Sequence, residues 1–342
     1  MMKKLKEITD IEWEITNKCN LSCPMCPRNN YGGETIPELK LYDFTLNDVK
    51  NIINFDEIDL KHVYFCGTYG DPCANNNLLD IIEWLKNNQV HIGIHTNGSL
   101  RTKKWWSKLS EVLDDNDFVT FSIDGLEDTN ALYRRNSNWD KILENAISFN
   151  GVKHWDFIVF RHNEHQINDA RKLAKKMNFS SFNVKNTCRF INKKHQKVES
   201  WNVNNEYEIF PPINEKYINE SLRFTDNKYS HIKCYYNSIN KIYIGADGYV
   251  FPCGWLHDRL YGVEVKNDDD KEKIYNIFND ENNVFKNNLK FIVDNCFTEL
   301  EKTFEKNPLK RCQFICGNTN NMIKNQNKFV KGYSCDNWTT RK

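Results

Sequence analysis

Short apolar runs alternate with amphipathic stretches along the first 185 residues of the chain. The runs are rich in β-branched and aromatic residues, which is typical of strands, and they cover Ile11–Thr16, His62–Cys66, Val90–Thr96, Phe118–Ile123, Trp155–Phe160 and Ser181–Lys185. Apolar positions three and four residues apart predict helices over Leu78–Leu85, Lys104–Leu113, Trp139–Phe149 and Ile167–Met177. This alternation indicates a parallel sheet with helices outside it. Six strand–helix units are fewer than the eight of a closed barrel, so we expect an α/β fold with a partial, TIM-like (β/α)6 barrel.

The alternation ends after residue 185. Pro211-Pro212 and scattered polar residues are typical of a bridging region. Further on, Lys241–Ile244 and Tyr249–Phe251 flank an Asp-Gly pair. This pattern predicts a β-hairpin, because glycine supplies the positive φ that a tight turn needs. We therefore expect a barrel over residues 1–185, a bridge over 186–233 and a small cysteine-rich domain with a β-hairpin over 234–342.

Charge and hydropathy exclude several classes of protein. The 342 residues carry 47 Lys and Arg against 46 Asp and Glu, which gives a formal net charge of +1. A nearly neutral chain has no overall field that attracts it to nucleic acid or to an anionic membrane, so neither partner is expected. The sequence has no uninterrupted apolar run of membrane-spanning length. Its N-terminus lacks the apolar core of a secretory signal. We expect a cytoplasmic protein, in which thiols stay reduced.

Cysteine is the most informative residue type, with 12 in the chain. Reduced, clustered cysteines are more often metal ligands or catalytic groups than disulfides. Cys19, Cys23 and Cys26 follow the first predicted strand with the spacing Cys-x-x-x-Cys-x-x-Cys. A loop this short can place three thiolates on one face of an iron–sulfur cluster and leave one iron open. A zinc knuckle is the alternative, but it would need a fourth ligand, and no Cys or His follows within thirty residues.

Three further motifs follow the next three predicted strands. They are Gly67-Thr68-Tyr69-Gly70-Asp71-Pro72, Thr96-Asn97-Gly98 and Ser122-Ile123-Asp124-Gly125. Together with TNKCNLSCPMCPR, these motifs resemble those of the radical S-adenosylmethionine (radical SAM) family over roughly residues 11–185. The family's Gly-Glu-Pro turn is matched here with Asp in place of Glu.

The resemblance implies both a cofactor and a reaction. Cys19, Cys23 and Cys26 would hold a [4Fe-4S] cluster whose open iron binds SAM. In this family one electron from the reduced cluster cleaves SAM, and the resulting 5′-deoxyadenosyl radical abstracts a hydrogen atom from the substrate. A reduced flavodoxin or ferredoxin would be the electron donor.

The resemblance also implies SAM-binding roles for single residues. Met25 would contact adenine through backbone groups, and Gly70 and Asp71 would approach the methionine amino group. Ser122 and Asp124 would lie near the ribose or the carboxylate of SAM, Arg134 would bind that carboxylate and Asn163 would contact the ribose. Arg135 is adjacent to Arg134 and is the alternative to it. For each residue the other interpretation is a turn-forming or capping role.

Six more cysteines follow residue 230, at Cys234, Cys253, Cys296, Cys312, Cys316 and Cys335. The hairpin that ends at Cys253 resembles the SPASM/twitch extension of radical SAM enzymes, which holds auxiliary [4Fe-4S] clusters. Six cysteines cannot supply the eight thiolates of two complete clusters. We therefore expect one auxiliary [4Fe-4S] cluster on Cys234, Cys253, Cys312 and Cys316. Cys296 and Cys335 would serve a second, incomplete cluster or be plain thiols, and a four-cysteine zinc site is the alternative.

Four other residues have plainer interpretations. Cys66 and Cys188 are predicted to be core thiols, because each lies at or just past a predicted strand. Cys73 follows the Gly-Asp-Pro turn and His95 precedes Thr96, so both could lie beside the site. A core or surface position is the simpler expectation for them.

The resemblance narrows the function to an oxidoreductase-type radical SAM enzyme. We expect the substrate to be a peptide or a protein side chain. Only 18 residues precede Cys19, which leaves no room for a fused N-terminal peptide-recognition domain and weakens the leader-peptide interpretation without removing it. A radical SAM oxidation or rearrangement of a small molecule is one alternative. A non-enzymatic zinc or iron–sulfur binding module is the other.

Overall fold

The fold is described from a computed structural model, which covers residues 1–29, 35–186, 190, 200–203, 206–217, 232–257 and 270–317. Cys188 and Cys335 lie outside these residues, so the predictions made for them stay predictions. Within the described ranges no helix is long and apolar enough to cross a membrane.

Eight strands form one sheet in the order β10-β9-β1-β2-β3-β4-β5-β6. Their bounds are β1 Asp10–Trp13, β2 His62–Phe65, β3 His91–Thr96, β4 Phe118–Ser122, β5 Lys153–Ile158, β6 Ser181–Lys185, β9 Lys241–Ile244 and β10 Val250–Phe251. β1 pairs in parallel with both β2 and β9, and β4, β5 and β6 also pair in parallel. The order begins at β10 and ends at β6, so the sheet is not closed. The prediction of an α/β fold with an open parallel sheet is confirmed.

Helices follow the parallel strands, as the alternation predicts. Their bounds are η1 Leu5–Glu7, α1 Leu46–Ile52, η2 Pro72–Ala74, α2 Leu78–Asn87, α3 Lys103–Val112, α4 Asn130–Tyr133, α5 Trp139–Ser148, η3 Glu164–Gln166 and α6 Ile167–Lys176. Side chains begin several of them: Thr45 caps α1, Thr102 caps α3 and Asn138 caps α5, each accepting from a backbone N–H of the first turn. The four predicted helices match α2, α3, α5 and α6 to within two residues at each end.

The later part of the chain contains a short ribbon, the predicted hairpin and a set of helices. The bounds are β7 Trp201–Val203, β8 Tyr207–Ile209, η4 Glu215–Tyr217, α7 Tyr235–Ser238, α8 Gly254–His257, α9 Lys271–Ile277, η7 Asp280–Asn282, α10 Leu289–Phe291, the π-helical turn η8 Ile292–Cys296, α11 Phe297–Lys306 and α12 Lys310–Cys316. β9 and β10 form the predicted hairpin, whose turn contains Gly248 with φ +84°. Elements that were not predicted include helix α1, helix α11 and the antiparallel pair β7–β8.

Alternation along the strands separates an apolar face from a polar one. Ile11 and Trp13 of β1 are completely buried, and Glu12 alternates with them on the opposite face of the strand. In β4, Phe121 packs its ring 5.2 Å from that of Trp106 on α3, whereas Ser122 points to the other face. The apolar face therefore lies under helices and the other face carries polar groups.

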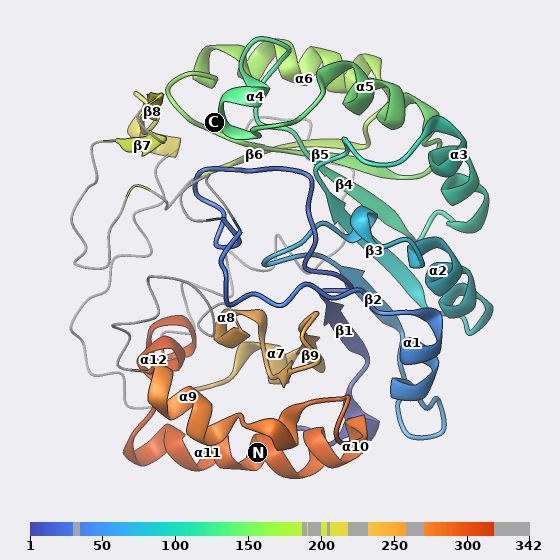
Figure 1. Ribbon diagram of the computed structural model, residues 1–342, viewed down its shortest axis with the longest axis vertical. Coiled ribbons are helices and arrows are strands. Elements are labelled where there is room, and N and C mark those ends of the chain that lie inside the picture. Colours follow the sequence, from blue (N-terminus) through green and yellow to red (C-terminus); the bar gives the residue numbers. More distant parts are fainter. Residues whose placement is uncertain are drawn as a thin grey trace. The chain divides into compact units, whose positions relative to one another are not determined.

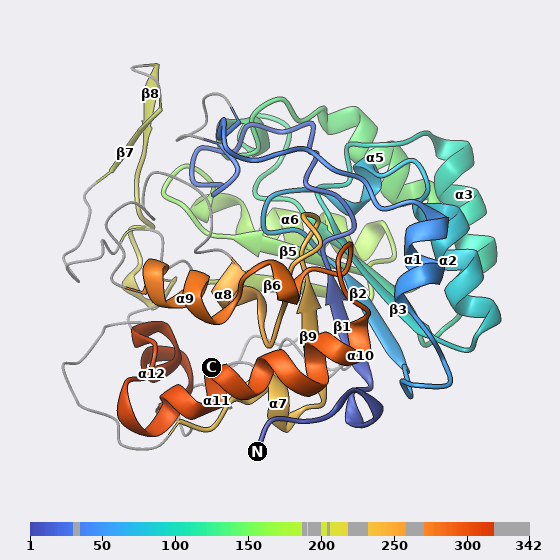
Figure 2. The same cartoon turned by 60° about the horizontal axis from the view of Figure 1, so that its bottom comes forward.

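Two compact units account for the contacts in the chain. Of the described residues, one unit contains 1–18, 36–93, 232–257 and 270–317, and the other contains 19–29, 35, 94–186, 190, 200–203 and 206–217. In the first unit, hairpin strand β9 runs beside β1 (Figures 1 and 2). In the second, α3, α5 and α6 lie along one side of β4, β5 and β6 (Figure 1). This grouping follows contacts in space, so the predicted boundaries at 185 and 233 stay predictions.

His154 makes the stability of the second unit sensitive to pH. The side chain is buried on β5, with Nδ1 2.9 Å from Ser181 Oγ on β6. Burial lowers the pKa of His154 to about 4, and the Asp156 carboxylate only partly offsets this. An unfolded histidine takes up its proton near pH 6.5, so between pH 6.5 and about 4 the unfolded chain binds more protons. The free energy of unfolding should therefore fall across this window as pH falls, by on the order of 3 kcal/mol for this residue.

Urea unfolding at several pH values tests this expectation. His154→Asn keeps a polar group beside Ser181 but does not titrate, so its free energy of unfolding should vary less with pH than that of the wild type. His162, whose pKa burial also lowers to about 4, supplies part of the slope that remains. Identical slopes for the variant and the wild type would contradict the assignment.

Candidate functional site

The three-cysteine loop follows β1 and is anchored by apolar packing. Cys23 is buried, and Cys19 and Cys26 are half-buried. The Cys26 amide donates to the Cys23 carbonyl at 3.1 Å, and the Leu21 amide donates to Cys19 Sγ at 3.4 Å. Cys19, Met25 and Cys26 pack against a buried apolar cluster that includes Leu21 and Cys23 and is completed by Tyr133, Phe160, Phe190, Val203 and Ile209. The loop thus holds its three thiols beside a dry wall, part of which comes from the unpredicted ribbon β7–β8.

Asn97 braces this loop. Its side-chain amide donates to Asn20 Oδ1 at 3.1 Å and lies 3.8 Å from Cys19 Sγ, within the range of an N–H···S hydrogen bond. Asn20 in turn donates to Ser99 Oγ at 2.9 Å. Gly98, with φ +76°, makes the turn that presents Asn97. Thr96-Asn97-Gly98 was recognised as a motif, but no role was predicted for Asn97. Its sulfur partner, Cys19, is 78 residues away in the sequence, so the neighbouring residues do not indicate the contact.

Arg134 and Asp124 form the charged pair of the second unit. Arg134 Nε donates to Asp124 Oδ2 at 2.6 Å, and the Asp124 side chain is completely buried. Burial alone would lower the pKa of Arg134, but the Asp124 carboxylate, Cys23 and Tyr133 together outweigh it, and the pKa stays above its usual value. Arg134 remains a cation, and its guanidinium hydrogen-bonds to the Cys23 thiol. It therefore reaches the cysteine loop, whereas Arg135 pairs with Glu206 at 2.9 Å.

The other predicted residues of this unit have well-defined partners. Ser122 Oγ lies 2.5 Å from His95 Nε2. Asp124 Oδ1 accepts from the Ile158 amide at 2.6 Å. The side-chain Nδ2 of Asn163 donates to the carbonyls of Asp124 and Ile158, and its Oδ1 accepts from the Phe160 backbone amide. Asn163 therefore has the turn-forming role that was its alternative interpretation, and a contact with SAM stays a prediction for it and for Asp124.

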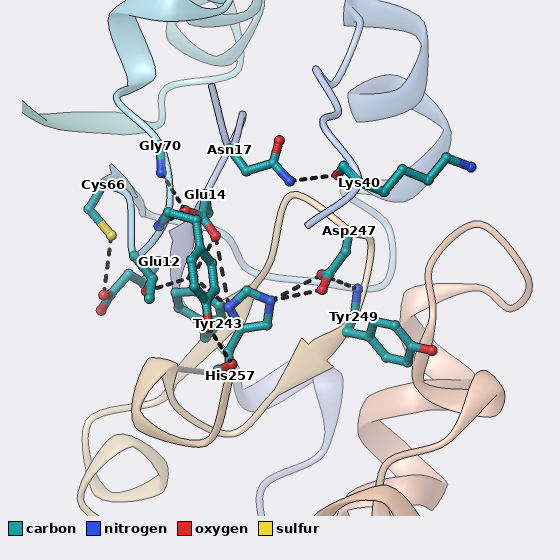
Figure 3. A network of polar contacts seen from close by, with 12 residues as sticks. Glu12, Glu14, Asn17, Lys40, Cys66, Gly70, Tyr243, Asp247, Tyr249 and His257 are labelled. Carbon is teal, nitrogen blue, oxygen red and sulfur yellow. Dashed lines mark hydrogen bonds and ion pairs between the residues drawn. The ribbon is translucent and has the colours of Figure 1, made fainter. Parts of the chain in front are cut away.

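The turn of residues 67–71 belongs to the first unit and is held by a buried carboxylate. The amides of Tyr69 and Gly70 both donate to Glu14 Oε1, at 2.5 and 2.9 Å, and Glu14 is completely buried (Figure 3). The Asp71 amide donates to the carbonyl of Lys18, the residue directly before Cys19, at 2.8 Å. The Asp71 side chain caps η2 by accepting from the Cys73 amide. No role was predicted for Glu14, although a carboxylate within the first predicted strand, Ile11–Thr16, was a signal for one.

Four of the later cysteines converge in the first unit. Cys234 precedes α7, Cys253 follows β10, and Cys312 and Cys316 stand one turn apart on α12. All four line one cavity, whose walls also include Pro252, Trp255, Leu256, Leu300 and Phe304. This is the set expected to hold an auxiliary cluster. Cys296 is not on the lining of that cavity, and its Sγ lies 4.0 Å from the Glu281 carbonyl oxygen.

The electrostatics of the four thiols suit a bound cation. Burial raises the pKa of Cys253 and Cys312 well above its ordinary value, and the nearby Cys234 adds to the effect in both. A hydrogen bond from Cys316 lowers the pKa of Cys234 and raises that of Cys316. Four thiolates cannot coexist in such a cavity without positive charge to offset them, so the donor set fits a metal ion or an iron–sulfur cluster.

The remaining predicted thiols are accounted for. Cys66 donates to Glu12 Oε1 at 3.2 Å, and burial raises its pKa well above the ordinary value. A thiol of this kind is not reactive, which agrees with the expectation of a core residue. Cys73 is completely buried.

Comparison with known proteins supports this interpretation. Residues 13–177 match the family model of the radical SAM superfamily, so a radical SAM domain is confirmed over that part of the chain. A tungsten-containing aldehyde ferredoxin oxidoreductase cofactor-modifying protein from Pyrococcus furiosus is 34% identical over 113 residues, which are 33% of this chain and 30% of the relative. A PqqA peptide cyclase from Bradyrhizobium diazoefficiens is 22% identical over 230 residues, which are 64% of this chain and 54% of the relative. The chain thus matches about half or less of these relatives' lengths.

A solved structure resembles almost the whole chain in fold. It is SuiB of Streptococcus suis bound to the precursor peptide SuiA, with a TM-score of 0.52 and 14% sequence identity. The match covers 90% of this chain and 66% of the SuiB chain. At this identity the likeness concerns the fold alone.

Proposed function

We propose that this chain, which contains a radical SAM domain over residues 13–177, is a radical SAM enzyme that abstracts a hydrogen atom from a peptide or protein side chain. The observation that carries the proposal is the loop of Cys19, Cys23 and Cys26, held after β1 beside a dry apolar wall within that domain. A [4Fe-4S] cluster on these thiolates supplies the electron that cleaves SAM and so starts the hydrogen abstraction. Reduced flavodoxin or ferredoxin is the proposed donor of that electron.

The residues that the motifs predict for SAM binding keep those roles in this proposal. Arg134, kept cationic by Asp124, is the proposed partner of the SAM carboxylate. Ser122 and the backbone of Met25 are proposed to contact the ribose and the adenine. Gly70 and Asp71 are proposed to bind the amino group. Asp124 and Asn163 support SAM binding by holding Arg134 and the end of β5 in place.

The four later cysteines are proposed to hold one auxiliary [4Fe-4S] cluster. A single zinc ion, with Zn–S bonds of about 2.3 Å, would draw its four sulfurs to within about 3.8 Å of one another. Among the described residues, no three of these four sulfur atoms lie within 4.8 Å of one another. We propose a cluster on these thiolates in preference to a single ion, and the ratio of iron to zinc in anaerobically prepared protein tests this choice.

Two substrate classes have support. A relative that matches 64% of this chain is a PqqA peptide cyclase, which favours a peptide substrate. The more similar relative, which matches a shorter segment, is a cofactor-modifying protein, which favours a small molecule as the second candidate. A gene for a short precursor peptide beside the gene for this chain would favour the first.

Anaerobically prepared protein tests the proposal. We expect about eight irons per chain, four for each cluster, and formation of 5′-deoxyadenosine from SAM under reducing conditions. Iron-loaded, reduced protein that forms no 5′-deoxyadenosine would contradict the function. A non-enzymatic metal-binding module would give that result.

Gly70→Val should lower the affinity for SAM about tenfold or more. A Cβ at Gly70 would lie 2.0 Å from the Thr16 carbonyl oxygen and 2.7 Å from Asn17 Cα. The main chain would have to move, and the hydrogen bond from Gly70 to Glu14 would be lost or distorted. If the displaced turn loses one hydrogen bond to SAM, worth about 1.4 kcal/mol, the affinity falls about tenfold. Equilibrium dialysis with labelled SAM measures the change.

The matched control is Gly151→Ala. The three atoms nearest to its Cβ all belong to the ring of Phe149, outside the proposed SAM site, so SAM affinity of the folded variant should stay at the wild-type value. Unchanged affinity in a folded Gly70→Val variant would remove residues 67–71 from the SAM site.

A further inference from the structure

Glu14 connects the turn of residues 67–71 to the β9–β10 hairpin. Cys253, one of the four cysteines, follows this hairpin. Its Oε1 accepts from the amides of Tyr69 and Gly70. Its Oε2 accepts from the Tyr243 hydroxyl at 3.2 Å and lies 3.8 Å from His257 Nδ1 (Figure 3). One completely buried carboxylate thus holds two different segments with its two oxygens.

His257 stands at the other end of this connection. It ends the one-turn helix α8, which begins at Gly254, directly after Cys253. Its Nε2 lies 3.0 and 3.1 Å from the two carboxylate oxygens of Asp247 in the hairpin turn. The imidazole is 1% exposed and lies between the carboxylates of Asp247 and Glu14. Any shift of Cys253 that carries α8 along therefore moves a group that Glu14 contacts.

Two consecutive residues of the turn, Thr68 and Tyr69, contact Tyr243 and His257 directly. Thr68 Oγ1 lies 3.2 Å from the Tyr243 hydroxyl. Tyr69 packs its ring edge-on against His257, with centroids 5.4 Å apart, and its hydroxyl donates to the His257 carbonyl at 3.4 Å. Packing is close on the hairpin side as well, because a Cβ at Gly245 would lie 2.4 Å from His257 Nε2. An assembly packed this tightly transmits displacement instead of absorbing it.

We propose that Glu14, Tyr69 and His257 couple the four-cysteine site to SAM binding, so that a metal cluster bound at the cysteines raises the affinity for SAM. The inference rests on the proposed function, in which the turn of residues 67–71 binds SAM. Ligation fixes Cys253, and with it α8 and His257. The contacts of His257 with Glu14 and Tyr69 then hold the Gly70 amide in the position that it occupies when SAM is bound. By linkage, SAM raises the affinity of the cysteines for the cluster by the same factor.

SAM dissociation constants of full-length variants with the first cluster loaded test the coupling. Cys316→Ala removes an auxiliary ligand on α12 without altering the hairpin or α8. We expect it to raise the dissociation constant of SAM about five- to tenfold, within the usual range of coupling between sites. His257→Phe, which keeps a ring against Tyr69, should raise it by a similar factor. The double variant should bind SAM no more weakly than the weaker of the two single variants, because both substitutions interrupt the same connection.

Tyr249→Phe is the matched control on the same hairpin. It removes only the hydroxyl that donates to Asp280, so SAM affinity should stay at the wild-type value. If His257→Phe does not fold, Tyr69→Phe takes its place. Tyr69→Phe should raise the dissociation constant of SAM by a smaller factor. Adding Cys316→Ala should not multiply that factor. Wild-type SAM affinity in a Cys316→Ala chain that has lost its auxiliary metal overturns the coupling. Effects that multiply in the double variant overturn the path through His257. A loaded wild-type chain that binds no SAM overturns the proposed function itself.

Discussion

Replacing Cys19, Cys23 and Cys26 together with alanine abolishes formation of 5′-deoxyadenosine and leaves about four irons per chain. The first expectation follows because no cluster remains to deliver an electron to SAM. The second follows because Cys234, Cys253, Cys312 and Cys316 line their cavity in the other compact unit and do not use the first loop. The iron count corresponds to one auxiliary [4Fe-4S] cluster. Iron analysis of the anaerobic variant and chromatography of its SAM reaction give the two readouts.

Cys66→Ser is the control for the triple variant. Cys66 belongs to neither cysteine set and donates to Glu12, so both clusters and the formation of 5′-deoxyadenosine should persist. Continued 5′-deoxyadenosine formation by the triple variant would rule out the radical SAM mechanism. About eight irons in the triple variant would indicate two auxiliary clusters, and zinc in place of iron would make the later site structural.

Most of the barrel could be predicted because its signal is local. Strands β1 to β6 lie within three residues of their predicted ends. The spacing of apolar residues along the sequence is enough to indicate such strands and the amphipathic helices between them. Helix α1 was missed, although Thr45 and Asp48 cap it reciprocally. The ribbon β7–β8 was missed because three-residue strands carry almost no periodic signal. Its Val203 and Ile209 nevertheless pack into the apolar cluster beside the cysteine loop.

The cysteines of the candidate site could be singled out from the sequence, whereas the residues that hold the site in place could not. Cysteine spacing identifies thiolates that could share a metal, and the four expected auxiliary cysteines do line one cavity. Residues such as Asn97, Glu14 and His257 have partners tens to hundreds of positions away in sequence. Nothing in the residues beside them indicates those partners. Arg134 and Arg135 are adjacent and chemically alike, and only tertiary structure places Arg134 beside Asp124 and Cys23.

The auxiliary site offers a second large effect, in which Cys312→Ala loses auxiliary iron and Cys296→Ala does not. Cys312 lines the cavity together with the other three thiols. Cys296 lies at the end of the π-helical turn η8, and its sulfur is near the Glu281 carbonyl. Cys296 is the natural matched control, because burial raises the pKa of both thiols and both are buried to a similar degree.

Both substitutions are best made in the Cys19/Cys23/Cys26→Ala background, where auxiliary iron is the only iron expected. Cys312→Ala should then fall well below four irons per chain after passage over a chelating resin, because a cluster left with three thiolates exposes one iron to the chelator. Cys296→Ala should keep about four. The reverse result, with full iron in Cys312→Ala and loss in Cys296→Ala, would replace Cys312 by Cys296 in the ligand set. That exchange would require the Cys296 sulfur to move away from Glu281 and into the cavity, so the iron counts of these two variants decide whether the fourth ligand beside Cys234, Cys253 and Cys316 comes from α12 or from η8.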